Sequence, residues 1–553
     1  MHHHGNPFDL RRALAALLPP PRPLPTPAQR RSFNDYFVTH LPSSSQSPDR
    51  VSSSAPSTGT TPRKSANRDT TIVRIPLKSA KHHFGAHTSR GARPYNEDRF
   101  NAGTVEVPAF AKPSPLQLPS GKEIATAASS ERSGDPQVFY FGVFDGHGGA
   151  ECAEFLQERL HGYVEEAALL FGVESSLRKD GEEGGDDWGE DGGGVMGAQD
   201  AEDLQKSLVS SWRETVGGYF KRFRPEHFPA VTRRRSDPSS DDRTATSEAE
   251  TKNNAMETVL TYAFLKADLD FTTAQASKHT ATQSRTPRTS MDDPVLSDRP
   301  LNDNDMLFHP TRPASQNLRQ PPKTPRPSST PDLALPIGGP TRFSGGSTAS
   351  IALISTPSAT PFWHPASPST LLVAHCGDTR ILLSRTSDGL AVPVTTNHHP
   401  DSPVEERRLR RFASTFVTDS FGESRIDGLA NTRAFGDIGS KRLGVSAEPE
   451  VTLHQLQPSE YAFMVLMSDG VSGHLSDQEI IDTVKESKTP EAGARELVGF
   501  AVEVAEEADN ATALVVRLGG WEKRTDGGEG AKGTGKMRAW RMEEAMDPRR
   551  ARQ

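Results

Sequence analysis

The sequence predicts an α+β fold in which layers of strands pack on each other and are covered by helices. Short apolar runs at 138–144, 371–376, 462–467 and 511–518 end at Gly, Asp or Asn and are too short for helices, so each is typical of a buried strand. These strands occur in groups. Helix signals interrupt the groups twice, which is the pattern expected for sheet-on-sheet layers with helices on their flanks.

The helices are expected from start signals and apolar periodicity. An apolar stripe at 152–164 follows a pair of glycines and predicts the first long helix. Ser476 and Glu479 have the spacing of a capping box, and Thr489-Pro490 places Pro at the first position of another helix.

Composition limits how much of the 553-residue chain can form this core. The chain contains 45 Gly and 44 Pro, its hydrophobic residues make up 33%, and its mean hydropathy is −0.61. Polar segments of this kind bury too little apolar surface to offset the entropy lost on ordering. We therefore expect one folded domain with disordered segments: a basic N-terminal region at 1–71, the domain at 72–520, insertions near 172–202, 229–250 and 277–340, and a tail at 521–553.

Charge and cysteine content exclude several classes of protein. A net charge of −8 gives no overall attraction to nucleic acid. Cys152 and Cys376 are too few for a disulfide framework and are expected to be packed thiols in a reducing compartment. No run approaches the roughly eighteen apolar residues that a membrane-spanning helix needs. We expect no nucleic-acid partner and no transmembrane segment.

Acidic residues gather where the predicted strands end. They form four clusters: Asn96-Glu97-Asp98, the Asp145 segment FDGHGG at 144–149, Ser468-Asp469-Gly470 and Asp509-Asn510. Carboxylates at the ends of buried strands are costly unless they are paired or bind metal, and no matching set of Lys or Arg accompanies them. Oxygen ligands without a His/Cys group favour Mg²⁺ or Mn²⁺. Two such ions bridged by a carboxylate and a water produce a hydroxide for in-line attack on phosphorus, so the sequence predicts a binuclear phosphohydrolase.

Eight short motifs occur in a fixed order along the chain. They are SRGARPYNEDR at 89–99, FDGHGG at 144–149, SGGSTA at 344–349, CGDTR at 376–380, NHHP at 397–400, TRAFGD at 432–437, MSDG at 467–470 and DNAT at 509–512. Each motif alone is weak, but their order resembles that of the metal-dependent serine/threonine phosphatases of type 2C. The resemblance implies a four-layer αββα sandwich of two antiparallel sheets flanked by helices, and phosphoserine or phosphothreonine proteins as substrates.

The resemblance also implies a metal centre of two Mg²⁺ or Mn²⁺ ions. The bridging ligand would be Asp145, and the carbonyl of Gly146 would be a further ligand. The remaining implied ligands fall into two pairs: Asp469 and Asp509 in the shell of one ion, and Glu97 and Asp98 on the other ion, directly or through water.

Two further residues are assigned to catalysis by the same resemblance. Arg93 would hold the substrate phosphate with two hydrogen bonds. His147 would protonate the serine or threonine leaving oxygen as general acid. The alternative for His147 is that it only orients the water molecules on the metals.

Some positions depart from the family pattern or have a simpler reading. Gly473 stands where the family has an Asp that helps to hold a third, accessory ion, and the Asp expected shortly before Ser344 is missing. The accessory site is therefore left open. Asp378 and Asp437 each follow Gly in a turn, and we expect both to be structural, since Asp in a turn bonds nearby backbone N–H groups.

Alternatives to catalysis are a pseudophosphatase and a scaffold with a phosphatase-like fold. Because Arg93, Asp145, Asp469 and Asp509 are all present, we expect an enzyme. Leu10, Leu14, Leu17 and Leu18 lie beside arginines, as in an organelle transit segment, although a plain disordered tail fits them equally. The segments at 468–473 and 509–521 resemble the fungal mitochondrial branch of the family. We therefore expect a mitochondrial location, and otherwise a cytoplasmic one.

Overall fold

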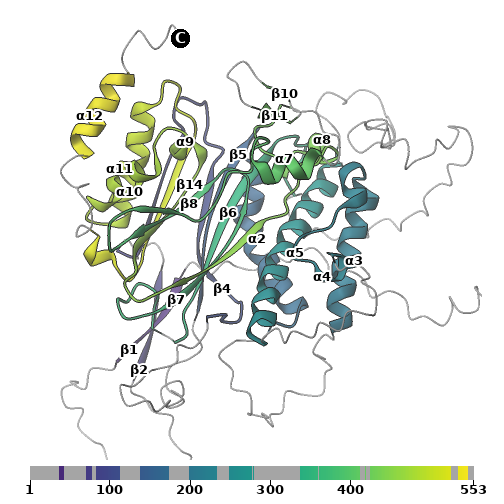
Figure 1. The fold of residues 1–553 in the computed structure, drawn as a ribbon, viewed down its shortest axis with the longest axis horizontal. Helices are drawn as coiled ribbons and strands as arrows, with labels where there is room; N and C mark the ends of the chain where they lie inside the picture. The colour runs from purple at the N-terminus through teal and green to yellow at the C-terminus, as the bar shows by residue number, and fades with distance from the viewer. Residues whose placement is uncertain are drawn as a thin grey trace, which may run out of the picture.

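A computed structural model describes the structure of thirteen segments of the chain. These are residues 36–42, 70–76, 82–111, 137–173, 198–232, 248–276, 278, 337–358, 360–410, 417–418, 424–426, 428–524 and 534–545. The described parts of the chain form two large antiparallel sheets with helices on both sides (Figure 1). The predicted α+β sandwich is therefore confirmed.

The first sheet has six strands. In sheet order they are β13 (Glu450–Leu456), β7 (Ser369–Cys376), β6 (Gly346–Ser355), β5 (Val138–His147) and β4 (Arg99–Val105), and the short β12 (Phe435–Gly436) pairs with β6. All neighbours are antiparallel. In an antiparallel pair the end of one strand lies beside the start of the next, and here Phe144 of β5 pairs with Arg99 of β4.

The second sheet has five strands, again antiparallel. In sheet order they are β3 (Phe84–Ser89), β15 (Ala511–Arg517), β14 (Tyr461–Met467), β8 (Arg380–Arg385) and β9 (Ala391–Pro393). Met467 at the end of β14 lies opposite Ala513 near the start of β15. The same edge therefore collects the segments that follow β14 and precede β15.

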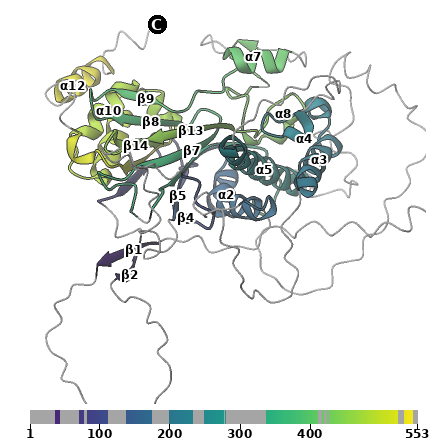
Figure 2. The same ribbon diagram turned by 60° about the horizontal axis from the view of Figure 1, so that its bottom comes forward.

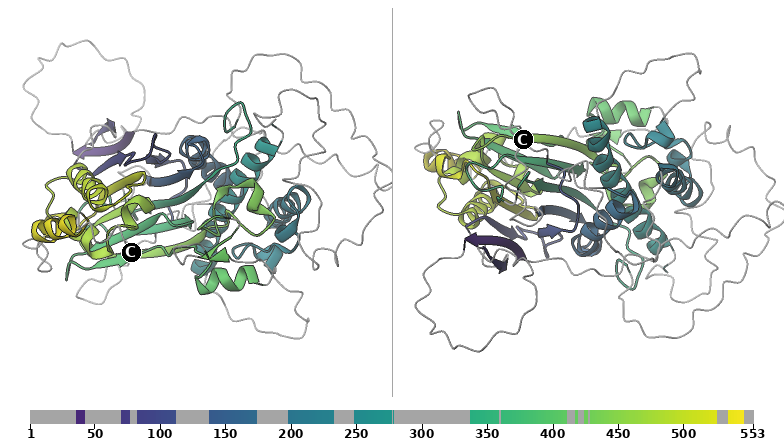
Figure 3. Two further views of the ribbon diagram at one scale, coloured as in Figure 1. Left: turned by 90° about the horizontal axis from the view of Figure 1, so that it is seen from above. Right: turned by 90° about the horizontal axis from the view of Figure 1, so that it is seen from below.

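Helices cover the outer face of each sheet. α2, α3 and α5 lie on one side and α10, α11 and α12 on the other, which is clear when the molecule is viewed from above and below (Figure 3). The helices are α2 (Glu151–Leu170), α3 (Ala198–Thr215), α4 (Pro229–Thr232), α5 (Glu248–Ala276), α7 (Pro403–Arg410), α8 (Ile438–Lys441), α9 (Asp469–Ser472), α10 (Asp477–Lys485), α11 (Pro490–Val504), α12 (Thr534–Ala545) and the 3₁₀ turns η3 (Gly218–Arg222) and η6 (Trp521–Lys523). Among the described residues no helix is both long enough and apolar enough to cross a membrane.

Central strands such as β5 and β14 are apolar along most of their length because both of their faces are buried. In β5, Phe139, Phe141 and Val143 belong to the core between the sheets, whereas Tyr140 and Phe144 belong to the core under α2 and α5. Side chains of a strand alternate between faces, so a strand covered on both sides shows no polar alternation. This explains the continuous apolar runs in the sequence.

The predicted helix starts agree with the structure. Ser476 caps α10 in a complete capping box with Glu479, and Thr489 caps α11 with Pro490 at its first position. Cys152 and Cys376 are free and buried, as expected.

The structure corrects the predicted boundaries at the N-terminus and in the insertions. β1 (Tyr36–Pro42) pairs with β2 (Thr70–Pro76), so a strand lies within the region 1–71 that was expected to be disordered (Figure 2). α3 begins inside the expected insertion at 172–202, and α4 lies inside that at 229–250. A second small sheet joins β10 (Val417–Thr418) and β11 (Ser424–Arg425). The remainder of the region 1–71 and most of the three insertions lie outside the described residues.

The expectation of a disordered tail at 521–553 is wrong for two of its segments. Trp521 is buried in the core beneath α11, and residues 534–545 form α12. Arg538 of α12 pairs with Glu496 at 3.0 Å and Glu503 at 2.6 Å, both on α11. Arg541 donates a hydrogen bond to the His474 carbonyl at 2.6 Å. These arginine contacts therefore hold α12 on the domain.

Candidate metal and phosphate site

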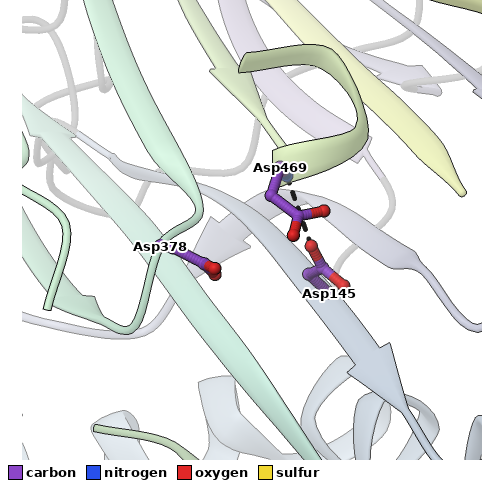
Figure 4. A group of neighbouring side chains, drawn as sticks. All are labelled: Asp145, Asp378 and Asp469. Carbon is purple, nitrogen blue, oxygen red and sulfur yellow. Dashed lines mark hydrogen bonds between the residues drawn. The ribbon is translucent and has the colours of Figure 1, made fainter. Parts of the chain in front are cut away.

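Three carboxylates meet where the two sheets come together. Asp145 lies near the end of β5, Asp378 lies in the connection from β7 in one sheet to β8 in the other, and Asp469 begins α9 directly after β14. One carboxylate oxygen of each lies within 4.8 Å of the others (Figure 4). The backbone N–H of Asp469 also donates to Asp145 Oδ2 at 3.3 Å.

The Glu97-Asp98 segment reaches this cluster because Gly146 has no side chain. A Cβ at Gly146 would lie 2.6 Å from the Glu97 carbonyl oxygen, which no real Cβ tolerates. Asp98 is buried beside the cluster, and its Oδ2 accepts a hydrogen bond from the Ser468 hydroxyl at 2.8 Å. Gly146 thus permits the close approach of two segments that the sequence separates by almost fifty residues.

Asn510 fixes the loop that carries the SRGARPYNEDR motif at 89–99. Its Oδ1 accepts from the Glu97 backbone N–H at 2.7 Å, and its Nδ2 donates to the carbonyls of Arg90 and Tyr95, each at 3.0 Å. From the sequence Asn510 was expected only as part of the motif at 509–512, without a role of its own. Its amide side chain carries both the donor and the acceptor needed to bridge strand β15 to this loop.

Arg93 and Asp509 form an ion pair at the rim. Arg93 Nη2 lies 2.7 Å from Asp509 Oδ2, and the Arg93 side chain is 60% exposed. The loop held by Asn510 therefore presents a guanidinium to solvent next to the acidic cluster.

His147 lies at the end of β5 and contacts a buried carboxylate. Its Nε2 is 2.8 Å from Asp437 Oδ1. Burial lowers the pKa of His147, but the hydrogen bond and the charge of Asp437 outweigh burial, so the net shift of the pKa is upward.

The expectation that Asp378 and Asp437 are only turn residues is wrong. Asp378 belongs to the carboxylate cluster, and Asp437 contacts His147 rather than the backbone N–H groups of the helix it precedes. Although burial raises the pKa of Asp378, interactions with His399 and Asn431 outweigh it and lower the pKa below its usual value. A usable signal was present for Asp378, since it follows a buried strand by two residues, just as the other acidic clusters flank strands.

The cluster is electrostatically unbalanced without a cation. Burial, together with the charges of Asp469 and Asp98, raises the pKa of Asp145 well above its usual value. Burial is also the main cause that raises the pKa of Asp98 to about 6 and that of Asp469 to about 7. Asp98 Oδ1 is buried and accepts no hydrogen bond from the described residues. An all-oxygen donor set with a spare buried oxygen fits Mg²⁺ or Mn²⁺.

These shifts predict a pH-dependent stabilisation by metal. In the metal-free fold the pKa values of these carboxyl groups lie above their unfolded values of about 4. Stability is therefore lost as the pH rises from about 4 through about 6 to 7, because the carboxylates ionise and repel one another. A divalent ion removes that repulsion, whereas protons compete with it at low pH. We expect Mn²⁺ to raise the melting temperature of the full chain more at about pH 8 than at about pH 5.

Differential scanning fluorimetry with and without Mn²⁺ measures this effect. The Asp145→Asn variant serves as the control, because it removes one charge from the cluster with little change in shape. An equal Mn²⁺ effect at both pH values, or an undiminished effect in Asp145→Asn, would contradict the assignment of the cluster.

Comparison with known proteins decides the family. The sequence pattern described as protein phosphatase 2C matches residues 332–510. Protein phosphatase 2C homolog 4 of Schizosaccharomyces pombe is 30% identical over 455 residues, which covers 82% of this chain and 84% of that protein. The chain belongs to the protein phosphatase 2C family.

Other similarities cover less of the chain or are more distant. Mitochondrial protein phosphatase 1K of Xenopus laevis is 36% identical over 154 residues, 28% of this chain and 40% of that protein. A crystal structure of serine-threonine phosphatase 2C from Toxoplasma gondii is 16% identical with a TM-score of 0.39, and the match covers 79% of this chain and 94% of that one. As a member of the family, the chain is a metal-dependent protein phosphatase.

Proposed function

We propose that this phosphatase 2C family member hydrolyses phosphoserine and phosphothreonine in proteins at a centre of two Mg²⁺ or Mn²⁺ ions. The observation that carries the proposal is the convergence of Asp145, Asp378 and Asp469 within 4.8 Å at the junction of the sheets. Buried acids in this number need cations, and ions so held supply the Lewis acid that activates water and neutralises phosphate charge.

The proposed metal ligands come from five segments of the chain. Asp145 would be the shared ligand, because one of its carboxylate oxygens lies within 4.8 Å of those of Asp378 and Asp469, and its backbone is fixed within β5. The other ligands are the Gly146 carbonyl, Asp469, Asp509, and Glu97 and Asp98 directly or through water. Asp378 joins this set, because one of its carboxylate oxygens lies within 4.8 Å of those of Asp145 and Asp469.

Arg93 is proposed to bind the substrate phosphate. Its side chain is exposed, and its present partner is the carboxylate of Asp509 at 2.7 Å. A phosphate offers the same pair of acceptor oxygens with more negative charge, so the guanidinium can exchange one partner for the other. This places the phosphorus beside the acidic cluster.

His147 is proposed to protonate the leaving oxygen of serine or threonine. It lies two residues after Asp145 on the same strand and is 39% exposed, so its ring lies near the cluster and remains accessible to substrate. An alkoxide leaves poorly without a proton, which makes a positioned acid valuable for this substrate class.

A pseudophosphatase or a scaffold would not hydrolyse a phosphorylated substrate, and this difference distinguishes both alternatives from the proposal. We expect the full chain to release phosphate from a phosphothreonine peptide in the presence of Mn²⁺. Chelation should abolish the activity, and Mg²⁺ or Mn²⁺ should restore it, since all proposed ligands are oxygens. A malachite-green phosphate assay measures it, with Asp145→Asn as the control for contaminating phosphatases. No turnover in the wild type above that control, or restoration by Zn²⁺ alone, would overturn the proposal.

We also propose that the N-terminal segment directs the protein to mitochondria. The support is the basic, leucine-bearing sequence at 10–31 and the printed location of the Xenopus laevis relative. Deleting residues 1–35, which ends just before β1, should move a fluorescent fusion from mitochondria to cytosol while in vitro phosphatase activity persists. A cytosolic signal from both the full-length and the shortened fusion would end this idea.

A further inference from the structure

Asp437 occupies a backbone conformation that the fold must enforce. Its φ is 45° and its ψ is 50°, in the left-handed region, and among the described non-glycine residues only Ser459 shares a positive φ. Asp and Asn are among the few residues that tolerate this conformation. The backbone N–H of Asp437 donates to the Gly345 carbonyl at 3.0 Å, which holds the turn against the start of β6.

The carboxylate of Asp437 is not used to cap its own helix. It precedes α8, yet its side chain accepts no hydrogen bond from the N–H groups at the start of that helix. Instead, Oδ1 lies 2.8 Å from His147 Nε2, and the side chain is only 5% exposed. The usual local explanation for Asp at a helix start therefore fails, and its partner is a residue 290 positions away.

The strand register explains why these two residues meet. His147 of β5 and Gly436 of β12 both pair with Gly346, from opposite sides of β6. A Cβ on Gly346 would lie 2.3 Å from Asp437 Oδ2, so only glycine leaves space for the carboxylate at this point. The sheet therefore has space for the Asp437 carboxylate because residue 346 is a glycine.

A buried ion pair fixes the turn on both sides of Asp437. Asp268 of α5 accepts from the Gly436 N–H at 2.9 Å and from Lys441 Nζ at 2.5 Å, and both charged side chains are fully buried. Lys441 also donates to the Ala434 carbonyl at 2.7 Å. A buried pair contributes little net stability, but it restricts the geometry of the segment it joins.

We infer that Asp437 is a positioning residue that orients His147 for proton donation to the leaving oxygen. A carboxylate only accepts, so the bond requires Nε2–H, and Nδ1 is then the ring nitrogen left to act on substrate. Before the step His147 is an imidazolium that carries a proton on both ring nitrogens; as the P–O bond breaks, its Nδ1 proton passes to the serine or threonine oxygen, and the ring becomes neutral with Nε2–H still bonded to Asp437. This inference rests on the proposed function, in which His147 is the general acid.

The test is a comparison of two leaving groups in the full chain with Mn²⁺. Asn tolerates the left-handed conformation at position 437, and Gly adopts it without strain. The Asp437→Asn and Asp437→Gly variants are therefore both compatible with the backbone of this turn. We expect kcat for a phosphoserine peptide to fall by about 10- to 100-fold in both variants, as for outer partners of a functional histidine. The p-nitrophenyl phosphate rate should fall much less, because p-nitrophenolate leaves without a proton, and KM for the peptide should change little.

A double variant separates positioning from a general structural role. If Asp437 acts only through His147, then His147→Gln combined with Asp437→Asn should be no slower than His147→Gln alone. The matched control is Asp388→Asn, since Asp388 lies in an exposed turn where it pairs with Arg385, and both substrates should be unaffected.

Two results would overturn the inference. One is an equal loss on both substrates in the Asp437 variants, and the other is a loss that adds fully to that of His147→Gln. A wild type that does not hydrolyse the phosphoserine peptide would instead remove the proposed function and this inference with it. Active wild type with a substrate-independent loss in the variants would remove only the positioning role.

Discussion

Replacing Asp145 with alanine is expected to abolish phosphate release, the largest effect of any single change in the site. Asp145 bonds the Asp469 backbone through Oδ2, and its carboxylate groups with those of Asp378 and Asp469. Its removal deprives the ions of the ligand that they are proposed to share. The loss should therefore exceed the ~10- to 100-fold cost typical of an outer-shell partner.

Phosphate release from a phosphothreonine peptide at saturating Mn²⁺ measures this loss. Far-UV circular dichroism of the variant should match the wild type, because the substitution removes charge repulsion from the metal-free fold. A variant that keeps more than about a tenth of wild-type kcat would show that Asp145 is at most an outer-shell partner.

The second large effect is expected for His147→Gln and depends on the substrate. General-acid catalysis contributes about 10²- to 10⁴-fold, and it matters most for a poorly stabilised alkoxide. The variant should lose activity in this range on a phosphoserine peptide and far less on p-nitrophenyl phosphate. Steady-state kinetics on the two substrates with one enzyme preparation make the comparison. Equal losses would exclude His147 as the acid and leave it as an organiser of metal-bound water.

The sheets were predictable from sequence because their strands are buried on both faces. The predicted strand at 462–467 is β14, in which Met464 and Leu466 face the other sheet and Phe463 and Val465 face α10 and α11. Such a run is apolar at every position and ends abruptly at Ser468-Asp469, where it reaches the site. The apolar run and the acidic residue that follows it therefore predict both the strand and the position of the site at its end.

The site acids were found by the same signal, but their neighbours were not. Asp378 and Asp437 both fit a local role as turn residues. Asp378 also follows a buried strand, but its place in the cluster, like the contact of Asp437 with His147, is seen only in the packing. Asp378 joins the cluster because β7 and β8 belong to different sheets, and Asp437 meets His147 because both β5 and β12 pair with β6. Neither of these two contacts can be predicted from the spacing of residues within one motif.

The C-terminal helix was missed for a related reason. Residues 534–545 carry charges without a broad apolar stripe, so the sequence there is typical of a solvated tail. What holds α12 is the match of Arg538 to Glu496 and Glu503, which lie at least 35 residues earlier on α11. Complementarity of this kind exists only once α11 has folded.

Electron paramagnetic resonance during a Mn²⁺ titration counts the ions bound to the chain and so tests whether the acidic cluster is the catalytic metal centre. We expect two ions per chain with spin coupling, because the ions of a two-metal site lie about 3.5–4 Å apart. Asp145→Ala should lose the coupled signal together with phosphate release. A fully active wild type that binds no Mn²⁺, or only isolated and uncoupled ions, would contradict the assignment of this acidic cluster as the catalytic metal centre.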